Sequence, residues 1–433
     1  MNELLVVGIV LIIGTGMGHL ASRVRLPRIS GYLVAGMLMS PAVTGWVSPE
    51  MVTHNLTPIV ALGLALIVFT IGGNLNLAQM RDLGRPIVLV AVCAAMAAFG
   101  LTVLLFITVV PRVSHIDGLH AGLWKTYLPV ALLLGAIACA TAAAPILSII
   151  REVRARGPLT TTVLSVVALD NILAIILFGI ASTTAAFLTA TGPVALYMGK
   201  FISFHALGLL GSIAVGVLGA GLLPLAIRGI HRMEILFVVV AGFVLACAGL
   251  AKTLHLSLPI ACMTFGFVAM NFSVKEEPIL DVFLPVDESV FTLFFAIAGM
   301  HLDLSVLYVA ALWVPFILVG WFGGKIAGAR LGGLLSKAPD AVSRFVGWAI
   351  LPKAGITIGL ILTVGHYLSD PWLAEVVINA VLGATIITEI VAPPLVKRAF
   401  LGAGEDQASR AKSRRQVSAE RPAPLPELES LSK

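Results

Sequence analysis

Three charged residues stand inside long apolar stretches of this sequence. Asp170, with Asn171 beside it, interrupts a run of valine, alanine, leucine and isoleucine. Lys325 lies among glycines in a second apolar stretch, and Lys353 follows Pro352 in a third. A carboxylate surrounded by hydrocarbon must be protonated, bind an ion or pair with a cation, and each of these states is reversible. The chemistry indicated is the reversible binding of protons and cations.

The two lysines are candidate charge partners. We expect Lys325 to pair with Asp170, because the flanking glycines let another helix backbone approach closely. The alternative is a side chain that extends to the cytoplasmic membrane surface, where Arg330 lies nearby. Lys353 is expected either to neutralise the carboxyl ends of half-helices or to repel a second cation. A purely structural ion pair remains the alternative for Asp170.

Thr141 and Glu389 complete the set of candidate residues. The Thr141 hydroxyl is placed either to bind an ion or to bond to its own helix backbone. Glu389 lies towards the cytoplasmic end of the last apolar stretch and is a candidate accessory acid. We expect its side chain to face solvent or an interface. The four cysteines lack the spacing of a metal site or a disulfide. We therefore predict no metal and no cofactor.

The elements that carry these residues are predicted to cross a membrane. The 433 residues are 59% hydrophobic and 12% charged, whereas an ordinary soluble domain has about 25% charged residues. A soluble enzyme, a nucleic-acid binder and a disordered scaffold are thereby excluded. The apolar residues form about thirteen blocks of roughly 20 residues, each able to cross a ~30 Å hydrocarbon layer as a helix. The blocks are centred roughly on residues 13, 38, 65, 98, 138, 174, 215, 242, 264, 297, 320, 355 and 384.

Basic residues indicate which ends of these spans face the cytoplasm. Most of the 28 lysines and arginines, which give a net charge of +6, lie in alternate loops and after the last span. This bias predicts a cytoplasmic C-terminus and, with an odd number of spans, a periplasmic N-terminus. The apolar run from Leu4 lacks the basic region of a cleaved signal and is expected to remain as the first span. Residues 401–433 are rich in Arg, Ser, Glu, Ala and Pro and are predicted to form a disordered cytoplasmic tail.

Short repeats relate the two halves of the chain. The segments Phe69-Thr-Ile-Gly-Gly and Phe295-Ala-Ile-Ala-Gly share a frame, in the third and tenth spans. Similar matches link the second span with the ninth and the fifth with the twelfth. An offset of seven spans reverses the direction of crossing. We therefore predict two inverted six-helix repeats, about 1–190 and 233–398, joined by a linker helix at about 203–227.

The fifth and twelfth spans are interrupted near their centres. Pro145 interrupts the first, and Pro352 with Gly355 interrupts the second. Proline removes a helical hydrogen bond, and such a break is tolerated in lipid only where it packs on protein or lines a cavity. We expect two broken helices that cross, with half-helix ends whose partial charges point at an ion. Two ordinary proline kinks are the alternative.

Together these motifs resemble the monovalent cation:proton antiporter family, the large sodium/proton exchanger group. The resemblance covers nearly all of residues 1–400. It rests on Leu26-Pro27 with Gly31 and Gly36, Ser40-Pro41, the Phe69 and Phe295 segments, Thr141 to Pro145, Arg151 to Pro158, Val167 to Asn171, Gly324-Lys325, Leu351 to Gly355, and Glu389 to Pro394. It implies a homodimer in which each protomer has a rigid dimerisation part and a mobile core that slides to carry its ion site across the membrane.

The resemblance also assigns roles to the candidate residues. The family usually has Asp-Asp or Asn-Asp where Asp170-Asn171 stands, and the second acid generally binds the ion while the first pairs with the lysine that Lys325 matches. In this sequence the second position is an amide. The Thr-Asp often found at the first break is Thr141-Ala142. The resemblance implies the family's fold together with an altered ion site.

These observations favour a secondary transporter that exchanges sodium or potassium for protons by alternating access. Asp170 is predicted to be the shared site, with Asn171 and Thr141 as neutral oxygen ligands and an electroneutral one-to-one exchange. The alternatives are an anion or organic-acid carrier on the same scaffold and a non-transporting sensor. No nucleophile–base set or phosphate-binding glycine loop is recognisable, so an enzyme is not predicted. The expected location is a bacterial inner membrane, with lipid as a partner and no nucleic acid.

Overall fold

A computed structural model describes eleven segments of the chain, in which every regular element is helical. The described residues are 2–24, 28–73, 84–113, 123–189, 198–230, 232–254, 256–273, 279–301, 307–353, 355–368 and 370–406.

The first half of the chain, with the predicted linker helix, contains both long and short helices. They are α1 (Glu3–Arg23), α2 (Arg28–Leu38), α3 (Thr57–Gly73), α5 (Arg85–Thr108), α6 (Val110–Val113), α7 (Leu128–Cys139), α8 (Ala143–Val153), α9 (Pro158–Thr189) and α10 (Met198–Ile227). The second half contains α11 (Met233–Thr253), α12 (Leu258–Val268), α13 (Leu284–Met300), α14 (Leu307–Leu318), α15 (Gly324–Leu335), α16 (Asp340–Ala349), α17 (Gly355–Ile361) and α18 (Pro371–Gly402). A π-helical turn, Val319–Gly323, makes α14 and α15 one continuous rod.

The helices confirm the prediction of an all-helical membrane protein. In the described residues, eight helices are long and apolar enough to cross a membrane, and three shorter apolar helices accompany them. Each predicted span except the second coincides with one helix or with two consecutive helices. The second span is placed wrongly, because α2 ends at Leu38, where its centre was expected. Ser40-Pro41 follows, and the chain turns there since proline offers no N–H to continue the helix.

Contacts between α2, α3, α12 and α13 show how the two halves are related. Gly36 of α2 lies so close to α13 that a Cβ would overlap the carbonyl oxygen of Ala296. Gly266 of α12 meets the Phe69 carbonyl of α3 in the same way. If α2 of the first half corresponds to α12 of the second, and α3 to α13, the α2–α13 contact and the α12–α3 contact are equivalent. In this structural correspondence Phe69 is equivalent to Ala296. The alignment of the sequence motifs instead pairs Phe69 with Phe295, one residue earlier.

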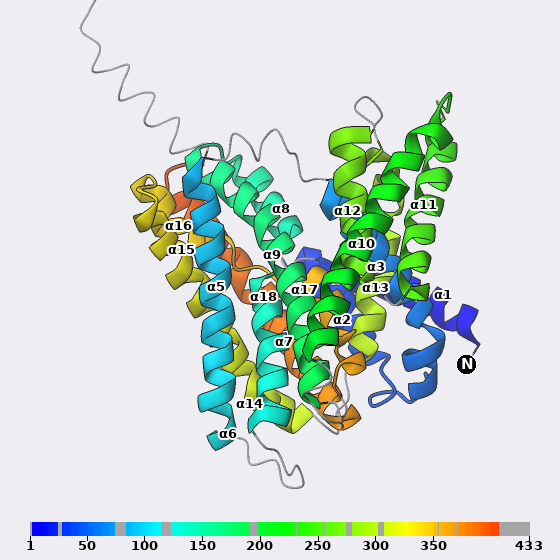
Figure 1. The fold of residues 1–433 in the computed structure, drawn as a ribbon, viewed down its shortest axis with the longest axis horizontal. Helices are drawn as coiled ribbons and strands as arrows, with labels where there is room; N and C mark the ends of the chain where they lie inside the picture. Colours follow the sequence, from blue (N-terminus) through cyan, green and yellow to red (C-terminus); the bar gives the residue numbers. More distant parts are fainter. Residues whose placement is uncertain are drawn as a thin grey trace, which may run out of the picture.

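The same correspondence between the two halves relates further pairs of packed helices. The packing of α1 on α2 matches that of α11 on α12, and the packing of α1 on α13 matches that of α11 on α3. The long helix α5 packs along α15, its own counterpart. In Figure 1, α5, α15 and α16 lie at the left, α1 and α11 at the right, and α7, α9, α17 and α18 between them. The repeat seen in the sequence is therefore also a repeat of packing.

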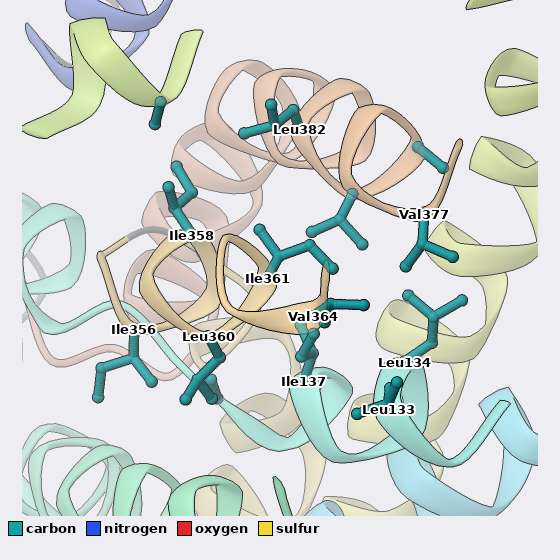
Figure 2. Packing of buried hydrophobic residues seen from close by; sticks show 14 of the residues in the cluster. Leu133, Leu134, Ile137, Ile356, Ile358, Leu360, Ile361, Val364, Val377 and Leu382 are labelled. Atoms are coloured by element: carbon teal, nitrogen blue, oxygen red, sulfur yellow. The ribbon is translucent and has the colours of Figure 1, made fainter. Parts of the chain in front are cut away.

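The short helix α17 lies in the centre of the molecule. Figure 2 shows it between α7 and α18, with Ile361 directed towards α18 and Leu360 towards α7. Ile358 and Ile361 are fully buried, as is Ile137 of α7. A helix of seven residues spans only about 10 Å, so it ends well inside the protein. It is held by its neighbours rather than by its own length.

The beginning of the predicted C-terminal tail is part of the folded protein. Helix α18 continues to Gly402, and Glu405 is almost fully buried. The Glu405 carboxylate accepts hydrogen bonds from the Leu159 and Thr160 backbone N–H groups, at 2.6 and 2.8 Å, and from the Thr160 hydroxyl at 2.7 Å. A carboxylate at a helix N-terminus satisfies free N–H groups and the helix dipole. The boundary at residue 401 is therefore wrong by at least six residues, and residues 407–433 lie outside the described part.

Replacing Glu405 by alanine should destabilise the protein, because it leaves the first N–H groups of α9 without their acceptor. We expect the free energy of unfolding to fall by about 1–2 kcal/mol, as for removal of a helix cap. Thermal unfolding of the detergent-solubilised protein measures the change. Glu152→Ala is the matched control, because Glu152 forms an exposed ion pair with Lys397 and its loss should cost less than about 1 kcal/mol. Equal effects of the two substitutions would contradict this role of Glu405.

Candidate ion site

The two interrupted spans meet at their breaks. Helix α7 ends at Cys139 and α8 starts at Ala143, while α16 ends at Ala349 and α17 starts at Gly355. The described residues of the two connecting segments are not helical, and the Ala142 N–H donates to the Pro352 carbonyl at 2.8 Å. The spans are thus true broken helices, tied together by a backbone hydrogen bond, and not kinked ones.

The prolines act at different places in the two breaks. Pro145 lies in the first turn of α8, where an N–H is not needed, and it leaves the Thr141 carbonyl without a helical donor. Pro352 lies in the non-helical connection itself, and its carbonyl accepts the bond from the other break. Gly355 begins α17. The local sequence therefore ends and restarts each helix where the crossing requires it.

Asp170 and Asn171 face the first break from α9. Both are buried, Asp170 completely. The Thr141 hydroxyl donates to Asp170 Oδ2 at 2.8 Å, and the Thr141 backbone N–H donates to Asn171 Oδ1 at 3.1 Å. Oδ1 of Asp170 has no hydrogen-bond partner among the described residues. The structure thus brings all three residues of the predicted ion site together.

Lys325 reaches the same point from α15. Its Nζ donates to Asp170 Oδ2, to the Cys139 carbonyl at 2.6 Å and to the Thr141 hydroxyl at 3.1 Å. The ion pair is fully buried on both sides, so the side chain does not extend to the membrane surface. Gly324 allows this approach, because a Cβ there would overlap the backbone of Ala98 on α5. An ammonium group has three donors, and all three are used here.

Lys353 neutralises the carboxyl end of α7. It is fully buried, and its Nζ donates to the carbonyls of Ala138 and Ala140. The ammonium also lies over the Trp321 ring, 5.2 Å from its centroid. The last carbonyls of a helix carry partial negative charge, and an aromatic face attracts a cation as well. Of the two roles considered for Lys353, the contacts are those of a helix-end partner.

Some groups that contribute to this site could not be predicted from the sequence. The carbonyls of residues 138–140 become acceptors only because α7 ends there, and Trp321 reaches Lys353 only because α14 and α15 form one rod. Glu389 takes part in none of the hydrogen bonds and ion pairs described above for this site. The expectation that it faces solvent or an interface is wrong, since it is fully buried. Its position near a helix end could not show that α18 is surrounded there by other helices.

The charges of the site are nearly balanced. Asp170 is negative, Lys325 and Lys353 are positive, and the end of α7 supplies a partial negative charge. The described residues contain no group of three or more His, Cys, Asp or Glu side chains able to hold a metal ion. The arrangement offers carboxylate, hydroxyl and carbonyl oxygens around one ammonium group. Such hard oxygens are also the ligands that alkali cations use in proteins.

Fold and site define a class of protein: a multi-pass helical membrane protein whose two halves cross at broken helices around a buried acid–lysine pair. The chain belongs to the sodium/hydrogen exchanger family, whose transmembrane model matches residues 7–401. This agrees with the resemblance derived from the motifs. Members of this family act as transporters and not as enzymes.

Individual relatives extend over nearly the whole chain. The Na(+)/H(+)-K(+) antiporter GerN of Bacillus cereus is 24% identical, covering 91% of this chain and 95% of GerN. The Na(+)/H(+) antiporter NhaS4 of Synechocystis is 25% identical, covering 92% and 97%. The solved structure of the sodium proton antiporter MjNhaP1 from Methanocaldococcus jannaschii aligns with a TM-score of 0.69 at 16% identity, covering 92% of this chain and 99% of that one. The last match shows a shared fold.

Removal of the Lys325 charge should strongly destabilise the protein. Lys325→Met leaves a buried carboxylate without its cation, and breaking a buried pair in this way costs about 3–5 kcal/mol. Asp170→Asn combined with Lys325→Met should restore most of this loss, because no unpaired charge remains. Unfolding midpoints in detergent at neutral pH compare the variants, with the exposed Lys397→Met as control. A double variant as unstable as Lys325→Met would show that the ion pair is not the cause.

Proposed function

We propose that this protein exchanges a monovalent cation, sodium or potassium, for protons by alternating access, with Asp170 as the shared ion and proton site. The observation that carries the proposal is the environment of the Lys325 ammonium, which sits among Asp170 Oδ2, the Cys139 carbonyl and the Thr141 hydroxyl. These are the oxygens that a dehydrated cation needs. Names of the relatives support the same reading, since each includes sodium and protons.

Competition for the oxygens of Asp170 explains how the exchange is coupled. A cation that binds there must displace the Lys325 ammonium, which then loses its proton, or must replace a proton on Asp170. In either case one proton leaves as one cation enters, and the site cannot hold both. Asp170 Oδ1, free of hydrogen bonds among the described residues, is a further ligand for the entering ion. At this site the exchange is electroneutral.

The complete burial of the Asp170–Lys325 ion pair supports a second candidate function. Asp170 and Lys325 are both fully buried and form an ion pair with each other, which also suits a non-transporting sensor with a structural pair. An anion or organic-acid carrier receives no such support. Both lysine ammonium groups are already bound to carbonyl or carboxylate oxygens.

Transport assays in proteoliposomes distinguish these candidates. Under an imposed pH gradient, adding sodium or potassium should collapse the gradient in the wild type and leave it intact in Asp170→Asn. The matched control is Asp340→Asn, an exposed acid on α16 that should behave as wild type. Lithium and rubidium extend the test of selectivity. No response of the wild type to any of the four ions between about pH 6 and 9, where a functional carboxyl must titrate, would reject cation exchange.

We further propose the assembly and orientation that the family resemblance and the loop charges imply. The protein is a homodimer in an inner membrane, its N-terminus periplasmic and its C-terminus cytoplasmic. The exchanger domain of each protomer has a rigid dimerisation part and a mobile core that contains the broken helices. The concentration of basic residues in alternate loops supports the orientation.

Reporter fusions test this orientation. Green fluorescent protein joined to the C-terminus should fluoresce in bacterial cells, and alkaline phosphatase joined at the same place should be inactive, because phosphatase folds only in the oxidising periplasm. Fusions after residue 230, a loop on the same predicted side, serve as the internal control. Active phosphatase at the C-terminus would reverse the orientation.

A further inference from the structure

Glu389 on α18 is a buried acid to which no counter-charge is bound in the part of the chain that the structure describes. The buried acids Asp170 and Glu405 are both bound, the first by Lys325 and Thr141 and the second by the start of α9. Glu389 is fully buried, and neither of its carboxylate oxygens has a hydrogen-bond partner within the described residues. An ionised carboxylate in that situation would be very costly, so the group is neutral in this conformation.

The neighbourhood of Glu389 supports a site rather than an accidental burial. The Thr385 hydroxyl, one helical turn earlier on the same face of α18, is also buried and has no partner among the described residues. The titratable or charged groups on helices packed against α18 are Arg28 and Tyr32 of α2, Arg151 and Glu152 of α8, Tyr308 of α14, and Asp340 and Arg344 of α16, with His366 in the turn after α17. Glu152 and Arg28 are bound in other ion pairs, and Asp340, Arg344 and Tyr308 are exposed.

Helical geometry directs Glu389 towards the broken helices. Val396 lies seven residues later, which is about 20° around the helix and therefore on the same face. Val396 is buried in a cluster with Ile146 and Ile149 of α8 and Val346 of α16. The face of α18 that carries Glu389 and Thr385 is thus the face that packs on α8 and α16, the half-helices of the two broken spans.

The backbone of α18 is weakened at this point. Pro393 and Pro394 lie inside the helix, and proline cannot donate to the carbonyl four residues earlier. The carbonyls of Glu389 and Ile390 are those acceptors, so the helix lacks two successive hydrogen bonds next to the buried acid. Prolines in a helix mark positions where it bends. The position next to Glu389 is therefore one at which α18 can change its direction.

We propose that Glu389 is a second exchangeable proton site, which binds a proton in this conformation and releases it in another conformation of the transport cycle. The O–H bond of the carboxyl breaks, its electron pair stays on the carboxylate oxygen, and the proton passes to water on the side to which the site has opened. When the site has released the cation and opened to the opposite side, Glu389 takes up a proton from the water there, and the helices close around the neutral acid again. Each cycle then moves one proton more than the exchange at Asp170 alone, so overall transport carries net charge.

This inference rests on the proposed cation/proton exchange, and the experiment separates the two. In proteoliposomes with a clamped membrane potential, the potential at which net flux stops gives the number of protons exchanged per cation. The wild type should exchange one proton more per cation than Glu389→Gln, whose amide is nearly isosteric but cannot ionise. Glu152→Gln, the same substitution at an exposed acid of α8, should keep the wild-type ratio.

The possible results have distinct meanings. An equal ratio in the wild type and Glu389→Gln overturns the second proton site and leaves exchange at Asp170 intact. Absence of any cation-dependent proton flux in the wild type overturns the proposed function itself. Unchanged thermal stability of Glu389→Gln is expected, because a neutral side chain of the same shape replaces a neutral acid.

A measurement on the wild type alone covers the case in which Glu389→Gln does not fold. Protons released into weakly buffered detergent solution are counted with a pH indicator as sodium or potassium is added. Release of one proton more per bound cation than the single proton exchanged at the Asp170–Lys325 pair supports the second site. Release of only a single proton per cation overturns it. Infrared spectra add an independent readout, since the C=O band of a protonated carboxylic acid should weaken as the cation binds.

Discussion

The structure depends on the hydrogen bonds that two buried lysine ammonium groups donate to the carbonyl groups at the end of helix α7. Helix α7 stops in the middle of the protein, and its last carbonyls have no helical donors. Lys325 and Lys353 donate to the carbonyls of Cys139, Ala138 and Ala140. Neither the lysines nor the carbonyls could be buried without the other, because each alone would be an unsatisfied polar group in an apolar interior.

This arrangement requires helices to approach one another very closely. Gly324 brings α15 against α5, and the rod formed with α14 carries both Lys325 and Trp321 to the crossing. Gly36 and Gly266 do the same for the helix pairs on the other side. Small residues substitute for a hydrophobic driving force when lipid is the solvent, since contact between backbones then supplies the packing energy. The glycines determine how near the charges can come.

The internal repeat is symmetric in packing and asymmetric in charge. Helix pairs exchange under the correspondence between halves, and α5 and α15 pack on each other across it. Yet Asp170, Asn171 and the α7 carbonyls come from the first half, whereas Lys325 and Lys353 come from the second. The attraction between these unlike sets holds the two halves together at their crossing. A symmetric distribution would place like charges face to face, which is unfavourable in a low dielectric.

The sequence by itself determined the helical membrane fold, the two breaks and the buried charges Asp170, Lys325 and Lys353, because hydrophobic length, proline and charge in lipid are local properties with large energies. Prediction from the sequence misplaced the second span, ended the folded region before Glu405 and left Glu389 exposed, because the position of each of these features depends on contacts with distant segments. Only the tertiary structure decided that Glu405 binds the start of α9, that Trp321 covers Lys353, and that Glu389 is enclosed without a partner among the described residues. Contacts between residues far apart in the chain follow from packing, and packing has no local signature.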